Sequence, residues 1–233
     1  MASEVTDSVG SRVARGRCEG SGNGAASPRI VSCPFPESVT VVELDIAPFR
    51  CAKDADSWAR SHGIVGLMSD VDTGGKGEIA ISAKSLNKML SGSALRKSVT
   101  PAIHFAALQR LRDIIRESFV AERHPDYTKE GGVRSPKNAV NRMVDIVVLY
   151  GCVSLGGIPY RAKTTLKETK YPGQPTKAYS YEISSIEVLA GNCRIELRPN
   201  ATTSMSVASL LNGVTDVNGK PLLDNFSSLN KEQ

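Results

Sequence analysis

Apolar and polar side chains alternate with a period of two in the second half of the chain, which is typical of β-strands. The alternation occurs in three segments, NRMVDIVVLY (141–150), GIPYRAKTTLKE (157–168) and KAYSYEISSIEVL (177–189). Short links separate them, and SLGGIP between the first two favours a tight reversal. We therefore predict an antiparallel meander of three strands.

A helical period precedes this meander in PAIHFAALQRLRDIIRESF (101–119). Thr100 followed by Pro101 supplies an N-cap and a first helical residue. We predict one long amphipathic helix over 101–119. The next stretch, 122–141, is polar, contains Gly and Pro, and predicts an exposed loop.

The N-terminal half contains shorter elements. SVTVVELDI (38–46) is rich in β-branched residues and predicts a strand. DADSWARSH predicts a helix with Asp54 as N-cap and Gly63 at its end. The segment 64–82 predicts two short strands around a Gly-rich turn, and a second short helix follows with Ser82 as its N-cap.

These elements predict one α+β domain over residues 28–198, with helices packed on a small antiparallel meander. Residues 1–27 are mostly small and polar, so they bury too little apolar surface to order, and we expect them to be disordered. Residues 199–233 predict a polar C-terminal tail with a short helix in MSVASLLNGV.

Composition narrows the class of protein. The chain has 233 residues, of which 40% are hydrophobic and 23% charged, as in ordinary globular proteins. The net charge of +5 and the pI near 9.0 agree with a nucleic-acid partner without requiring one. Aromatic residues make up 5%, which argues against a single-strand binder that relies on many stacking rings.

The five cysteines are scattered and form no CxxC motif, so we expect reduced thiols and a cytoplasmic location. No Cys or His pair has the spacing of zinc ligands, and we expect neither a metal nor a cofactor. No apolar stretch approaches the roughly 20 residues of a membrane span, so we expect no membrane partner.

The middle strand of the predicted meander carries the candidate chemistry. Its alternation sends Arg161, Lys163, Thr165 and Lys167 to one face. Metal-free RNA cleavage needs proton-transfer groups and cations that stabilise developing negative charge. The chain offers side chains of these types: the catalytic candidates are His104, Lys163, Thr165 and Lys167, and the substrate-binding candidates are Arg161, Tyr160, Tyr181 and His124.

Each of these residues also has an ordinary structural interpretation. His104 lies beside the apolar face of the predicted helix and suits a core or capping histidine. The cationic strand face suits a solvated sheet surface, and His124 suits a partner of a helix C-terminus. Tyr160 and Tyr181 suit core packing. The catalytic hypothesis requires His104 and the lysines to border one cleft.

The chain also contains a series of motifs between residues 38 and 187. They are DSWARSHGIVG, EIAIS, the helix from His104 to Ser118, PYRAKTTLKET and AYSYEISSIE. In this order they resemble the large polyvalent protein-associated domains of phages and integrative mobile elements. The tail TSMSVASLLNGV is similar to a segment that often follows such domains.

The resemblance implies a relation to the barnase–EndoU–colicin–RelE group of metal-independent RNases. In that group helices precede a four-stranded antiparallel sheet, and the active site lies on the open face of the sheet. The implied function is an RNase-like module acting on RNA, with an immunity or other partner protein. The alternative is a non-catalytic accessory module that binds nucleic acid or protein.

Overall fold

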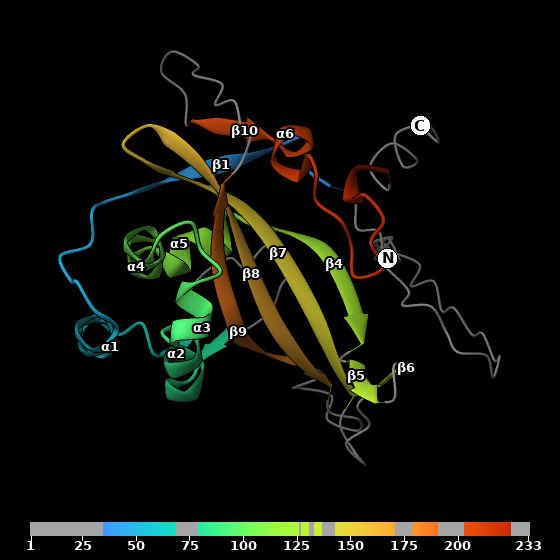
Figure 1. Ribbon diagram of the computed structural model, residues 1–233, viewed down its shortest axis with the longest axis horizontal. Coiled ribbons are helices and arrows are strands. Elements are labelled where there is room, and N and C mark those ends of the chain that lie inside the picture. Colours follow the sequence, from blue (N-terminus) through green and yellow to red (C-terminus); the bar gives the residue numbers. More distant parts are fainter. Residues whose placement is uncertain are drawn as a thin grey trace, which may run out of the picture.

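The computed structural model describes residues 35–68, 79–125, 127–130, 133–136, 143–170, 179–190 and 203–224. The segment 1–27, which we expect to be disordered, lies outside these ranges. The fold is α+β, as predicted, with the helices between residues 52 and 116 grouped on one face of a twisted sheet (Figure 1). The helices are α1 (Ala52–Ser61), α2 (Ala83–Met89), α3 (Gly92–Leu95), α4 (Pro101–Gln109), α5 (Leu111–Arg116) and α6 (Val207–Leu211).

The described strands form a sheet of eight and a separate pair, β5 and β6. Their bounds are β1 (Ser38–Leu44), β2 (Gly66–Met68), β3 (Ile79–Ile81), β4 (Phe119–Pro125), β5 (Tyr127–Glu130), β6 (Val133–Pro136), β7 (Met143–Leu155), β8 (Ile158–Lys170), β9 (Tyr179–Ala190) and β10 (Ser204–Ser206).

The predicted meander is β7–β8–β9, with each strand antiparallel to the next. The sheet is larger than predicted, and it is mixed because β1 runs parallel to β7 and β3 runs parallel to β9. Its order is β10-β1-β7-β8-β9-β3-β2, and β4 also pairs with β7. One edge of β7 is therefore shared by β4, along Asp145–Tyr150, and by β1, along Cys152–Leu155.

Two of the predicted helix caps are confirmed. Thr100 accepts a hydrogen bond from the amide of Ile103, with Pro101 at the first helical position. Ser82 accepts one from the amide of Ser85. The prediction of Asp54 as N-cap is wrong, because the N-cap is Cys51, three residues earlier, and Asp54 lies in the first turn of α1.

The predicted long helix over 101–119 is divided into α4 and α5 at Arg110, whose φ of −105° and ψ of 18° leave the helical region. The apolar residues around the break, Leu108 and Leu111, are fully buried, so tertiary packing overrides the local period. The prediction of a loop over 122–141 is also wrong in part. Residues 119–125 form β4, whose backbone pairs with β7.

Strand β7 is apolar on both faces, so the sheet has two cores. Val147, Leu149 and Val153 belong to the core between the sheet and helices α1–α5. Val148 and Tyr150 point the other way, into a second core. That second core is completed by apolar residues of the C-terminal segment, namely Met205, Val207, Leu210, Leu211, Val214 and Leu222.

The segment 203–224, expected to be a polar tail, therefore packs on the sheet. Strand β10 pairs with β1. Helix α6 covers the neighbouring part of the sheet, on the face that carries the second core (Figure 1). Arg161 of β8 fixes the end of α6, because its guanidinium donates to the carbonyl oxygens of Leu210 and Asn212. These carbonyls lie at the helix C-terminus, where a cation is favourable.

Gly151 in β7 gives a direct test of how closely the first helical layer approaches the sheet. A Cβ at this position would lie 2.4 Å from Ser118 Oγ and 3.5 Å from the carbonyl oxygen of Ile114. Gly151→Ala should therefore lower the free energy of unfolding by about 1–3 kcal/mol, the usual cost of overpacking. Chemical denaturation measures this loss.

The matched control is the same substitution in a Ser118→Ala background. Removing the hydroxyl removes the nearest atom, so Gly151→Ala should cost less there than in the native chain. Equal losses in the two backgrounds would contradict the close approach.

Candidate functional site

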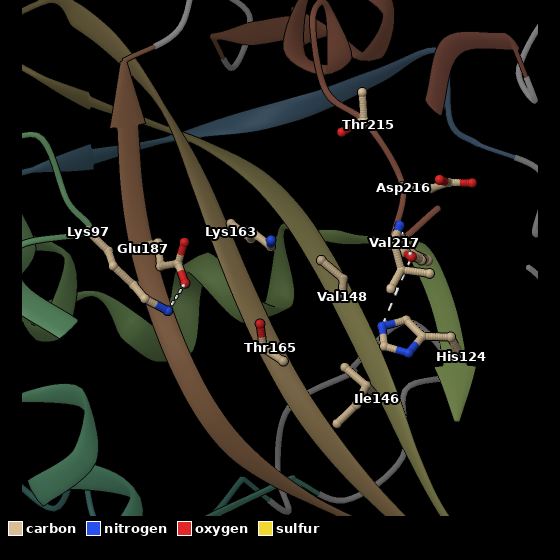
Figure 2. Close-up of a pocket in the computed structure, with 11 residues that line it drawn as sticks. Lys97, His124, Ile146, Val148, Lys163, Thr165, Glu187, Thr215, Asp216 and Val217 are labelled. Carbon is tan, nitrogen blue, oxygen red and sulfur yellow. Dashed lines mark hydrogen bonds and ion pairs between the residues drawn. The ribbon is translucent and has the colours of Figure 1, made fainter. Parts of the chain in front are cut away.

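A hollow of about 360 Å³ opens on the face of the sheet opposite to α1–α5. Figure 2 shows the side chains that surround it. Its lining residues are Lys97, Glu122, His124, Ile146, Val148, Lys163, Thr165, Glu187, Thr215, Asp216 and Val217.

Four adjacent strands supply the floor of the hollow in the order β9–β8–β7–β4. Thr165 lies directly opposite Val148 of β7, and Lys163 lies directly opposite Glu187 of β9. Period-two alternation keeps these side chains on one face. Residues 215–217, in the segment that follows α6, form a wall beside β4 (Figure 2).

The charged groups differ in how they are paired. Lys97, in the loop between α3 and α4, forms an ion pair with Glu187 at 3.0 Å. Within the described part of the chain, no hydrogen bond or ion pair joins the ammonium group of Lys163 to another residue. Lys163 is half-buried beside the apolar floor, which favours an anionic ligand as its partner.

Glu122 and His124 project from β4 on the same side. Glu122 is buried, and its Oε1 accepts a hydrogen bond of 2.7 Å from the amide of Val217. The same oxygen lies 4.0 Å from Nε2 of His124. The imidazole of His124, which is a proton-transfer group, thus has a carboxylate beside it.

Three residues predicted from the sequence meet in this hollow: Lys163 and Thr165, predicted as catalytic, and His124, predicted as substrate-binding. Lys167 lies two residues further along β8, is half-buried, and is not among the lining residues.

His104 does not share this hollow, and the predicted adjacency of its imidazole to the lysines is wrong. The side chain is fully buried in the first core, on the other side of the sheet. Its Nδ1 lies 2.8 Å from Ser98 Oγ, which accepts the amide of Val188. Burial lowers the pKa of His104 from 6.5 to about 4, although the Met89 carbonyl and the Glu187 charge raise it.

The other predicted substrate-binding residues lie elsewhere. Arg161 is buried against α6, and its guanidinium donates hydrogen bonds to the carbonyl oxygens of Leu210 and Asn212. Tyr160 packs against the first core. The backbone of Tyr181 pairs with β3 and β8, and its side chain lies outside the described residues.

Sequence reasoning missed Glu122, Glu187 and the wall at residues 215–217. Glu122 and His124 are two positions apart, which places them on one face only if the segment is a strand. The polar composition of residues 122–141 concealed that strand. The wall was missed because the C-terminal segment was expected to be a tail.

Two further findings concern the described ranges alone. Among them, no three His, Cys, Asp or Glu side chains converge so as to hold a metal ion. No helix in the same ranges is both long and apolar enough to cross a membrane.

Comparison with known families shows to which family the chain is related. The family model described as large polyvalent protein-associated domain 3 matches residues 50–179, more than half of the 233 residues. The chain belongs to this family. The family match contains the lining residues of the hollow from Lys97 to Thr165, whereas Glu187 and residues 215–217 lie beyond it. No curated protein and no solved structure matches the chain.

The buried imidazole of His104 predicts a pH dependence of stability. The unfolded chain binds a proton at His104 below about pH 6.5, but the folded chain does so only below about 4. The unfolded state therefore holds more protons between these values. Stability is lost as the pH falls through this window, with a slope of up to about 1.4 kcal/mol per pH unit from this residue.

The measurement is the free energy of unfolding of the native chain and of His104→Gln between pH 7.5 and 4.5. The difference between the two proteins should shrink as the pH falls, because only the native chain carries this proton linkage. A difference that stays constant over this range would contradict the neutral, buried state of His104.

Proposed function

We propose that this domain cleaves RNA without a metal ion, as a module of a polyvalent protein carried by a phage or an integrative element. The observation that supports this proposal is the convergence of His124, Lys163 and Thr165 in one hollow. These side chains come from strands β4 and β8, which lie on either side of β7.

The chemistry of RNA cleavage matches these side chains. The 2′-hydroxyl attacks the adjacent phosphorus, so a base must remove its proton, and a proton donor, here water, must protonate the departing 5′ oxygen. His124 supplies an imidazole to the hollow, the side chain most often used for proton transfer in catalysis. Lys163 stabilises the negative charge on the phosphoryl oxygens, and the Thr165 hydroxyl donates a hydrogen bond to them.

The position of the hollow also suits an extended chain. It lies on a sheet face rather than in a closed interior, and its volume is within the range of small ligand sites. This arrangement agrees with the RNase group implied by the sequence resemblance, in which the active site lies on the sheet. In our proposal His124 takes the part first assigned to His104.

A second function follows from the pairing of charges. Lys97 is already neutralised by Glu187, and one oxygen of Glu122 is used by the amide of Val217. A site whose groups are partly satisfied also suits an accessory module that binds RNA without cutting it. Salt-sensitive RNA binding without degradation would favour this function.

The test is cleavage of a single-stranded RNA in the presence of a chelator, compared with the same oligonucleotide lacking 2′-hydroxyl groups. We expect the native chain to cut only the RNA. His124→Gln and Lys163→Ala should each lower the rate by about 10²–10⁴-fold, the usual contribution of proton transfer or of an oriented cation.

Lys84→Ala is the matched control for Lys163→Ala. It removes the same charge from an exposed position in α2, on the opposite side of the sheet, and should leave the rate unchanged. Equal cleavage by the native chain and Lys163→Ala, or cutting of the oligonucleotide without 2′-hydroxyls, would refute the proposed mechanism.

A further inference from the structure

Every backbone amide of the turn at residues 216–220 donates a hydrogen bond. Four of these bonds stay within the turn, and one reaches a residue outside it. The amide of Asp216 donates to the Lys220 carbonyl, those of Asn218 and Lys220 donate to Asp216 Oδ1, and that of Gly219 donates to the Asp216 carbonyl. The amide of Val217 donates to Glu122 Oε1 at 2.7 Å. The turn therefore presents one fixed donor to β4.

This turn is held firmly against the sheet. The amide of Leu222 donates to the carbonyl of Val214, and the side chains of both residues are buried in the second core. The Val217 amide thus cannot move away from β4 without disturbing that core. Glu122, which it contacts, is correspondingly restrained.

Glu122 lies between this donor and the imidazole of His124. Its side chain is 7% exposed, and Oε1 lies 4.0 Å from His124 Nε2. A buried carboxylate at this distance forms an ion pair when the imidazole gains a proton. Such a pair orients the ring and stabilises the cation that proton abstraction generates.

We propose that Glu122 is a positioning residue for His124, and that the turn at residues 216–220 keeps Glu122 in place through the Val217 amide. This inference rests on the proposed function. In the reaction the 2′ O–H bond breaks and its proton passes to the imidazole, while the 2′ oxygen bonds to phosphorus. The bond from phosphorus to the 5′ oxygen breaks, and that oxygen takes a proton from water. The hydroxide that this leaves removes the proton from the imidazolium, which restores the neutral ring. Glu122 takes up no proton in these steps and only orients the ring.

Glu122→Gln tests the role of the charge, because the amide oxygen of Gln still accepts the Val217 hydrogen bond. We expect kcat for RNA cleavage to fall by about 10- to 100-fold while KM changes by less than about two-fold. Glu43→Gln is the matched control, since it removes a carboxylate from an exposed position in β1 and should change neither constant.

A double-mutant cycle shows whether Glu122 acts through His124. In a His124→Gln background, Glu122→Gln should cause no further loss, because the group that it positions is already absent. Multiplicative losses in the double variant, or a rise in KM with unchanged kcat, would overturn the proposal.

A measurement without RNA separates this inference from the proposed function. Side-chain NMR couplings of His124 should report a single χ1 rotamer in the native chain and averaged rotamers in Glu122→Ala. One fixed rotamer in both proteins would overturn the positioning role. A native chain that cuts no RNA but shows the rotamer change would refute the RNase proposal alone.

Asp216 tests the part played by the turn. Asp216→Ala removes the acceptor of two amides, whereas Asp216→Asn retains the oxygen that accepts them. We expect Asp216→Ala to lower kcat as Glu122→Gln does, and Asp216→Asn to lower it by less than about two-fold. An unchanged kcat in Asp216→Ala would overturn the role of the turn.

Discussion

Strand β7 imposes the main constraint on this protein, because it must be covered on both faces. Leu149 and Val153 are fully buried against the helices, while Val148 and Tyr150 are buried on the other side. A strand with one polar face leaves that face to solvent. Here the second apolar face requires α6 and the segment after it, so covering the sheet also builds a wall beside the candidate site.

The candidate site exists because the C-terminal segment covers only part of the second face of the sheet. The C-terminal segment covers the face of the sheet beside β1, through α6 and the residues after it. The hollow lies where this cover ends. At this boundary Lys163 is half-buried and Glu122 is buried. Polar groups at such a position interact more strongly than on an open surface, since fewer water molecules compete with them. This is the physical basis for placing the candidate chemistry on the part of the cationic face of β8 that the hollow encloses.

The sequence predicted those elements whose signals are local. Alternation over β7, β8 and β9 predicted the meander, and the Thr100–Pro101 pair predicted the start of α4. Other features depend on distant partners. The polar residues of β4 form a strand because β7 supplies their hydrogen bonds, and His104 turned inward because its helix is buried almost all round. Alternation alone placed Lys163 and Thr165 on the correct face, but it contains no information on which histidine lies opposite them.

The position of the wall has an evolutionary consequence. Lys163 and His124 lie inside the region that defines the family, whereas Val217 is contributed by residues that follow it. A relative with the same central region and a different ending would keep the cation and the imidazole but surround them with another rim. Exchange of the ending alone would then change the shape of the hollow, while Lys163 and His124 stayed in place.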